Sequence, residues 1–206
     1  MQWQNWERDM IVVKIGGSVA EIAGKIFSEL YETGESILVI PGGWIFAEKI
    51  RKMDVDDDSA HWMAIEAMNM YGYYLSKYAD LVEPYDFDFQ LRGVKILLPY
   101  TLLKRYDELP HSWDVTSDSI AVWIAEKINA EKIIKVTDVD GIVVDGGVVE
   151  RIRAGDINFE TCIDRFAPLL LERYGREMFI CNGYGRGRVK DYIMKGIAFG
   201  TTVIGR

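Results

Sequence analysis

The chain has 206 residues, of which 49% are hydrophobic and 12% aromatic, a composition that excludes an intrinsically disordered protein and predicts a globular one. Its 32 Asp and Glu outnumber its 24 Lys and Arg, so the formal net charge is −8 and neither nucleic acid nor an anionic membrane is an expected partner of the surface as a whole. Any phosphate-binding site must therefore be formed locally.

The cysteine and histidine content and the lack of long apolar runs exclude further classes of protein. Cys162 and Cys181 are too few for a disulfide framework and lack metal-ligand spacing, which predicts buried free thiols. With only His61 and His111, a histidine-based metal centre is not expected. No apolar run reaches the roughly 18 residues of a membrane span, and the segment MQWQNWERDM has neither the basic start nor the apolar core of a targeting signal. We therefore expect a cytoplasmic protein.

The first predicted element is a β-branched strand within the stretch IVVKIGGSVAE, and it contains a lysine, Lys14. Gly16 and Gly17 then allow a tight turn with exposed N–H groups, and Ser18 can cap a helix over about Val19–Glu32. Amide dipoles at a helix N-terminus beside a fixed cation predict an anion site. A snorkelling lysine at a strand end is the alternative interpretation of Lys14.

The same unit then repeats. Ser36–Ile40 is predicted to be a strand, Pro41–Gly43 a second glycine turn, and WIFAEKIRKM a helix. In an open α/β sheet the ligand crevice lies at the carboxyl ends of the strands. We therefore expect Gly42 and Gly43 to converge with the first turn on one edge.

A long helix follows the acidic loop Asp54–Asp58, with Ser59 as its expected cap. One stripe of this helix is apolar at helical spacing, which indicates core packing or a subunit contact: Ala60, Met63, Ala64, Ala67, Met68, Tyr71 and Leu75. Because this is more apolar surface than one sheet face needs, we expect a homo-oligomer. His61, beside the loop, could meet the phosphate of an acceptor, although a satisfied structural histidine is the simpler interpretation.

Strands and helices keep alternating in the second half. The expected elements are the strand VKILLP, the helix SDSIAVWIAEKINA, the strand EKIIKVT, a loop and hairpin DVDGIVVDGGVVERI, the helix FETCIDRFAPLLLERYG, the strand EMFICN, the loop GYGRG, the helix RVKDYIMKG and the strand TTVIG. This order predicts an α/β protein with an open, mainly parallel sheet sandwiched by helices in three layers. The glycine spacings match neither a Walker A loop nor a dinucleotide fingerprint.

Four segments in this order, VVKIGGS, VIPGGW, TSDSIAVWIAEKINAEKIIKVTDVDGI and GTTVIG, resemble the amino-acid kinase superfamily. The resemblance covers nearly the whole chain and is strongest to the uridylate and isopentenyl phosphate kinases. It implies a single amino-acid kinase-like domain over 1–206, with an acceptor-binding lobe over about 1–110 and a nucleotide-binding lobe over about 111–206. It also implies ATP as co-substrate, Mg²⁺ bridging its phosphates and a small phosphate monoester as acceptor.

The resemblance implies roles for individual residues. Lys14 would bind the donor phosphates and stabilise the transferred group, and Asp118 would hold Lys14 in its charged form. The amides of Gly16, Gly17, Gly42 and Gly43 would cradle donor and acceptor oxygens. Ser18 and His61 complete the expected phosphate- and substrate-binding residues. The expected nucleotide-binding residues are Thr137, Asp138, Asp140 and Gly141. From the residues alone, Asp118 could also be a plain helix N-terminal carboxylate, and Asp138 and Asp140 could be turn formers.

The chain departs from the family at one catalytic position. Relatives carry a second catalytic lysine in a G-M-x-x-K motif before the penultimate strand, whereas this chain reads ERIRAGDINFETCIDRFAPLLLERYG there. The cation that replaces it stays open among the nearby arginines Arg151, Arg153, Arg165, Arg186 and Arg188.

The acceptor is the least defined part of the expected reaction. The length and the segment DSAHWMAIEAMNMYG resemble an archaeal branch that phosphorylates an aminomethylfuran-methyl phosphate in methanofuran synthesis. Acceptors of uridylate, isopentenyl phosphate or carboxylate type, and a non-catalytic nucleotide- or oxyanion-binding protein, are the alternatives.

Overall fold

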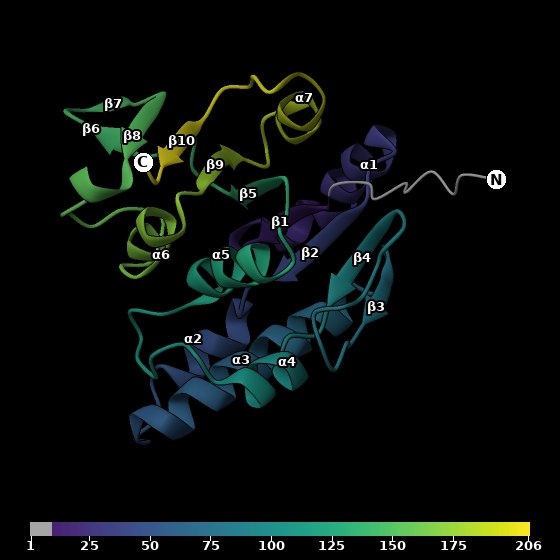
Figure 1. Ribbon diagram of the computed structural model, residues 1–206, viewed down its shortest axis with the longest axis vertical. Coiled ribbons are helices and arrows are strands. Elements are labelled where there is room, and N and C mark those ends of the chain that lie inside the picture. The colour runs from purple at the N-terminus through teal and green to yellow at the C-terminus, as the bar shows by residue number, and fades with distance from the viewer. Residues whose placement is uncertain (1–9) are drawn as a thin grey trace.

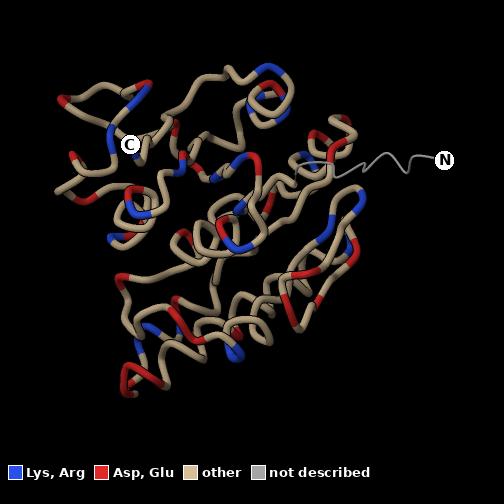
Figure 2. Tube along the Cα trace, viewed as in Figure 1, with Lys and Arg blue, Asp and Glu red and all other residues tan. Residues whose placement is uncertain are grey.

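The computed structural model describes residues 10–206 (Figure 1). Nearly all of the segment MQWQNWERDM, with the prediction that it is not a targeting signal, lies outside the described residues. Within residues 10–206, no helix combines the length and the apolar character that crossing a membrane requires. Figure 2 shows basic and acidic residues interspersed along the described chain, so a strongly charged site has to be built by a few neighbouring side chains.

Eight strands form one sheet in the order β3-β4-β2-β1-β5-β9-β10-β8. Adjacent strands run parallel, except that β10 is antiparallel to β9. The strands of this sheet are β1 (Ile11–Ile15), β2 (Ile37–Pro41), β3 (Asp80–Val82), β4 (Val94–Leu97), β5 (Lys132–Thr137), β8 (Arg151–Arg153), β9 (Glu177–Asn182) and β10 (Thr201–Ile204). The predicted hairpin is present as β6 (Val143–Val144) and β7 (Gly147–Val148). The predicted fold class is confirmed.

Two hydrophobic cores cover the two faces of the sheet, because successive side chains of a strand point to opposite faces. Val12 packs in the core that α5 and α6 cover, whereas Val13 packs in the core that α1 and α7 cover. Figure 1 shows α2, α3 and α4 grouped in the lower part of the view, away from β6, β7 and β8. The α-helices are α1 (Ala23–Thr33), α2 (Trp44–Ile50), α3 (Asp57–Leu75), α4 (Tyr100–Tyr106), α5 (Ser117–Lys127), α6 (Ala167–Tyr174) and α7 (Arg188–Lys195).

Several predicted helix starts are wrong, and each error has a local cause. Ser18 does not cap a helix, because a 3-10 segment, Gly17–Ile22, separates the first turn from α1. Ser59 is not the cap of α3 either: the helix begins two residues earlier, and Asp56 caps it by accepting from the Ser59 N–H at 2.9 Å. The helix expected from FETCIDRFAPLLLERYG begins only at Ala167, and the chain before it is irregular.

The structure also differs from the sequence prediction in smaller details. β3 and α4 are additional short elements that the pattern did not reveal. Both cysteines are free; Cys181 is buried as predicted, whereas Cys162 is only half-buried. In the predicted apolar stripe of α3, Met63 and Ala64 are half-buried and the other five side chains are buried.

Candidate active site

The two glycine turns meet at the carboxyl edge of the sheet, as the parallel topology predicts. A Cβ atom placed on Gly42 would lie 3.5 Å from the Gly17 amide nitrogen and 3.5 Å from the Ser117 Oγ atom. The first turn, the second turn and the N-terminus of α5 therefore surround one small volume.

Close approach, rather than an unusual backbone conformation, explains the glycines of these turns. A Cβ atom on Gly17 would lie 2.5 Å from the Trp44 Cα atom, and one on Gly43 would lie 2.3 Å from the Ala47 Cβ atom. Gly16 has φ −70° and Gly43 has φ −88°, which any residue adopts. The left-handed residue of the second turn is instead Trp44, with φ 46°.

Only part of the expected amide cradle is free to bind an anion. The Gly16 N–H donates to the Val136 carbonyl at 3.0 Å, and the Gly42 N–H donates to the Ile15 carbonyl at 2.9 Å. The expectation that these two amides contact phosphate oxygens is therefore wrong. For the Gly17 and Gly43 amides, the described part of the chain offers no acceptor, so they keep the predicted role as a proposal.

A buried cluster of three charges lies beside the first turn. The Lys14 Nζ atom is 2.9 Å from the Asp118 Oδ1 atom, so the expected ion pair is present. The Lys135 Nζ atom is 2.6 Å from the other carboxylate oxygen, Oδ2. All three residues are buried. The Lys14 ammonium also lies against the turn, 3.7 Å from the position of a Cβ atom on Gly16.

The ionisation of the cluster follows from burial and from the two opposite charges. Burial alone would raise the pKa of Asp118, but the ammonium groups of Lys135 and Lys14 hold this pKa far below its usual range. Burial lowers the pKa of Lys14, and the Asp118 carboxylate opposes that shift. Asp118 is thus a fixed anion, and it favours the charged form of the lysine beside the turn.

Asp164 fixes the helix that carries Asp118. Its carboxylate accepts from the Thr116 and Ser119 amides at 2.8 and 3.0 Å, which satisfies donors at the start of α5. The same carboxylate accepts from the Ala167 amide at 2.8 Å and so also caps α6. One side chain therefore sets the position of both helix N-termini next to the charge cluster.

The predicted nucleotide-binding residues follow β5. The Thr137 Oγ1 atom lies 3.5 Å from the Ser18 Oγ atom of the first turn and donates to Asp138 at 3.1 Å. Partial burial raises the pKa of Asp138, but hydrogen bonds from Ser18 and Thr137 outweigh it and lower this pKa. Asp140 accepts from Arg188 and Asn182 of the last glycine loop region, so it joins the ends of β5 and β9.

Gly141, the last of the predicted nucleotide-binding residues, has a structural reason to be glycine. Its φ is 155°, and a Cβ atom there would lie 2.3 Å from the Thr201 Oγ1 atom. Glycine is needed at this position because the loop passes close to β10.

A pocket extends from the second turn along α3. Its empty space amounts to about 550 Å³ when the part open to solvent is included. Gly43 and Ser117 lie on its wall near the turns, and Asp57 and His61 come from the first turns of α3. The apolar part of the wall is formed mainly by Ala47, Ala64, Ile65, Met68, Val115 and Ile120.

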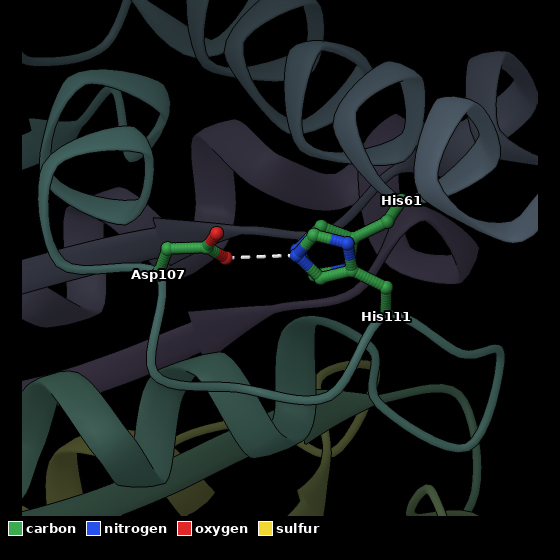
Figure 3. Close-up of side chains that lie close together, drawn as sticks. All are labelled: His61, Asp107 and His111. Carbon is green, nitrogen blue, oxygen red and sulfur yellow. Dashed lines mark hydrogen bonds and ion pairs between the residues drawn. The ribbon is translucent and has the colours of Figure 1, made fainter.

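His61, which lies in the wall of this pocket, forms a pair with His111 (Figure 3). Its ring stacks on that of His111, with ring centroids 4.0 Å apart and planes 17° from parallel. The His111 nitrogens lie 2.7 Å from Asp58 and 2.8 Å from Asp107, and hydrogen bonding to Asp107 and Asp58 raises the pKa of His111. Burial, together with His111, lowers the pKa of His61 to about 4.

This pair favours a structural role over phosphate or metal binding. A neutral His61 ring lines the pocket but supplies no cation for an acceptor phosphate. His61, His111 and Asp107 place ligand atoms within 4.8 Å of one another. However, two nearly parallel imidazole planes cannot both direct an in-plane lone pair at one ion, and both His111 nitrogens already contact carboxylates.

Two residues of the site were missed at the level of the sequence. Lys135 has the same signal as Lys14, a lysine within an apolar strand that ends at the carboxyl edge. Asp164 lies three residues before the first residue of α6, with a proline at the start of that helix, which is an N-terminal capping pattern.

The chain is similar to known proteins in sequence and in fold. The model of the "Amino acid kinase family" matches residues 9–161. The [5-(aminomethyl)furan-3-yl]methyl phosphate kinase of Methanocaldococcus jannaschii is 33% identical over 203 residues, which cover 89% of this chain and 93% of that protein.

Solved structures share the fold at lower identity. The UMP kinase from Ureaplasma parvum has a TM-score of 0.72 at 18% identity and covers 96% of this chain and 100% of its own. The uridylate kinase from Archaeoglobus fulgidus has a TM-score of 0.67 at 21% identity and covers 94% of this chain and 99% of its own.

Proposed function

We propose, from the premise that this chain belongs to the amino acid kinase family and is a phosphotransferase, that it transfers the γ-phosphoryl group of ATP to a small phosphate monoester. The observation that carries the proposal is the buried cluster of Lys14, Asp118 and Lys135 beside two glycine turns that open into a pocket. The best-supported acceptor is [5-(aminomethyl)furan-3-yl]methyl phosphate, the molecule in the name of the relative that is 33% identical.

The reaction needs positioning and charge more than covalent chemistry. An oxygen of the acceptor phosphate attacks the γ-phosphorus of ATP, the bond from that phosphorus to the β,γ-bridging oxygen breaks, and the products are ADP and a diphosphate. Lys14 would stabilise the negative charge on the transferred group, and the Gly17 and Gly43 amides would bind its oxygens or those of the acceptor. Asp118 would keep Lys14 charged and in place.

Mg²⁺ fits this site as a partner of the ATP phosphates. Mg²⁺ usually binds phosphate oxygens and water together with one or two carboxylates. Asp138 is the carboxylate that the structure joins to the first turn through Ser18, whose hydrogen bond lowers the pKa of Asp138 and so favours its ionised form. We therefore propose Asp138 as the residue that would hold the ion or one of its waters.

The pocket suits an acceptor of this kind. Its largely apolar wall can hold a small ring between the phosphate-binding turns and the start of α3. Asp57 is the carboxylate in that wall and can pair with the ammonium group of an aminomethyl substituent. The acceptor would thus be bound by the first part of the chain, up to about residue 110 and the loop that follows. Because ATP is the co-substrate, we propose a cytoplasmic location.

The test of the function is ADP formation with ATP, Mg²⁺ and one phosphate monoester at a time. We expect turnover with [5-(aminomethyl)furan-3-yl]methyl phosphate and background rates with uridylate, isopentenyl phosphate or no acceptor. Turnover with uridylate alone would replace the proposed acceptor. ATP binding without ADP formation in any mixture would support a non-catalytic nucleotide-binding protein instead.

Asp57→Asn should weaken binding of the amine-bearing acceptor. A charge-assisted pair is lost while the reacting atoms are untouched, so we expect KM for this acceptor to rise about tenfold with kcat nearly unchanged. Steady-state kinetics should show no such rise for the analogue without the aminomethyl group. Asp54→Asn, in the exposed loop before α3, is the control. An equal KM in wild type and Asp57→Asn would place the amine elsewhere.

The homo-oligomer stays a prediction, and α3 carries the surface for it. Tyr73, Met70 and Tyr74 are 59%, 48% and 36% exposed on this helix. Burying such a patch between copies of the chain would stabilise an assembly. Light scattering at micromolar concentration should give a mass above that of one chain. A monomer mass would contradict this prediction.

A further inference from the structure

Lys135 shares the buried carboxylate of Asp118 with Lys14. In the parallel pair of β1 and β5, Lys14 lies directly opposite Lys135. The two ammonium groups contact the two different oxygens of Asp118. We infer that Lys135 is the second cation of the phosphoryl-transfer site, a positioning residue that acts through Asp118 on Lys14. This inference rests on the proposed function.

Charge counting gives the physical reason for a second lysine. A pair formed by Lys14 and Asp118 alone has no net charge, and Lys135 adds one positive unit to it. The nearby Asp164 carboxylate is engaged by the amides of Thr116, Ser119 and Ala167. Transfer of a phosphoryl group needs positive charge near its oxygens. Since Asp118 and both lysines are buried, little water is present to screen this charge.

The contacts of Lys135 show why it acts through Asp118. Besides Asp118 Oδ2, its ammonium donates to the Cys162 carbonyl, and its side chain is 5% exposed. The group is therefore held inside the protein and does not reach toward the turns. By engaging Oδ2, it fixes the direction of the carboxylate and leaves Oδ1 for Lys14, whose remaining protons stay available to an anion at the first turn.

Three of the five arginines near the missing motif have other partners or positions. Arg188 pairs with Asp140, and Arg151 pairs with Glu177 on the exposed edge of the sheet. Arg165 lines a wider groove that adjoins the acceptor pocket. Among the described residues, no ion pair or hydrogen bond joins an arginine to Asp118, so the second cation on this carboxylate is Lys135; the Asp164 N–H also donates to Oδ2, at 3.3 Å.

The test compares three substitutions of Lys135 with one matched control. Lys135→Met keeps most of the apolar stem without the charge, Lys135→Gln keeps a polar donor without the charge, and Lys135→Arg keeps the charge. Lys132→Met is the control, because Lys132 lies on the same strand but donates to the Ile193 carbonyl and pairs with Glu131. Folding of each variant is checked by its thermal unfolding, and rates are expressed per folded protein.

We expect kcat to fall at least about tenfold in Lys135→Met and Lys135→Gln, with KM for ATP changed less than about threefold, because the lost charge acts mainly in the transition state. Lys135→Arg should retain most of the activity, and Lys132→Met should match wild type. Aluminium fluoride, a mimic of the transferred group, should tighten ADP binding in wild type at least about tenfold more than in Lys135→Met.

Normal kcat in a folded Lys135→Met or Lys135→Gln variant would overturn the inference. So would a loss of activity that only follows a loss of folded protein, since that result means a structural role. If Lys135→Met does not fold, the Gln variant decides by the same criteria, and the Arg variant decides if neither folds. A wild-type protein that turns over no acceptor, and whose ADP binding aluminium fluoride does not tighten, would refute the proposed function itself.

Discussion

Lys14→Met should lower kcat by at least about 10²–10³-fold, corresponding to about 3–4 kcal/mol of transition-state stabilisation. Lys14 is mounted on β1, a strand in the middle of the sheet, so its charge is in place before the reaction. Methionine keeps most of the apolar stem, and Asp118 keeps Lys135 as a partner, so no unpaired charge is left in the core. Activity should therefore fall far more than stability.

The matched control for this substitution is Lys25→Met. Lys25 is exposed on α1, where its ammonium donates to the Tyr184 carbonyl at 3.1 Å. We expect its free energy of unfolding to change by less than about 0.5 kcal/mol and its rate to stay near that of wild type. Kinetics with a verified acceptor and urea unfolding check both variants. Near-normal turnover of Lys14→Met would show that this lysine is not the phosphate-binding cation.

Asp118→Asn should damage stability and activity together. It removes the carboxylate shared by Lys14 and Lys135 and leaves two buried ammonium groups without an anion. Breaking a buried ion pair from one side typically costs about 3–5 kcal/mol, and we expect the free energy of unfolding to fall by that amount. Lys14 would also tend to lose its proton, because burial lowers its pKa and Asp118 is what opposes that shift, so kcat should fall at least as much as in Lys14→Met.

Glu126→Gln is the control for the Asp118 substitution, because it makes the same change of charge on the same helix. Glu126 is half-buried near the end of α5, and its side chain makes a long contact, 3.9 Å, with Arg176. Its free energy of unfolding should change by less than about 0.5 kcal/mol. An Asp118→Asn protein as stable and as active as the Glu126→Gln protein would contradict the shared-carboxylate arrangement.

The fold and the pair formed by Lys14 and Asp118 were predictable because local signals and one topological rule suffice for them. The repeated strand, glycine turn and helix indicate a parallel sheet, and the carboxyl ends of parallel strands lie on one edge. The amide contacts were not predictable in the same way. Whether the Gly16 N–H is free depends on the Val136 carbonyl of a strand more than a hundred residues later, which no local pattern reveals.

Lys135 and Asp164 show where sequence reasoning reached its limit. The segment EKIIKVT predicts a strand, but which face Lys135 occupies relative to Lys14 is fixed only by the register between β1 and β5. The sequence FETCIDRFAPLLLERYG predicts a helix that begins too early, because apolar residues at helical spacing also occur in the irregular segment before α6. Asp164 was therefore placed inside a helix and not recognised as a capping residue. The stacking of His61 on His111 likewise depends on a contact across 50 positions of the chain.

The most direct test of the proposed phosphoryl transfer is phosphorus NMR of the purified protein with ATP, Mg²⁺ and [5-(aminomethyl)furan-3-yl]methyl phosphate. The proposal predicts that the monoester signal of the acceptor is replaced by the two coupled signals of a diphosphate, in a one-to-one ratio with the ADP formed. Release of inorganic phosphate with the acceptor signal unchanged, or an unchanged spectrum, would contradict it.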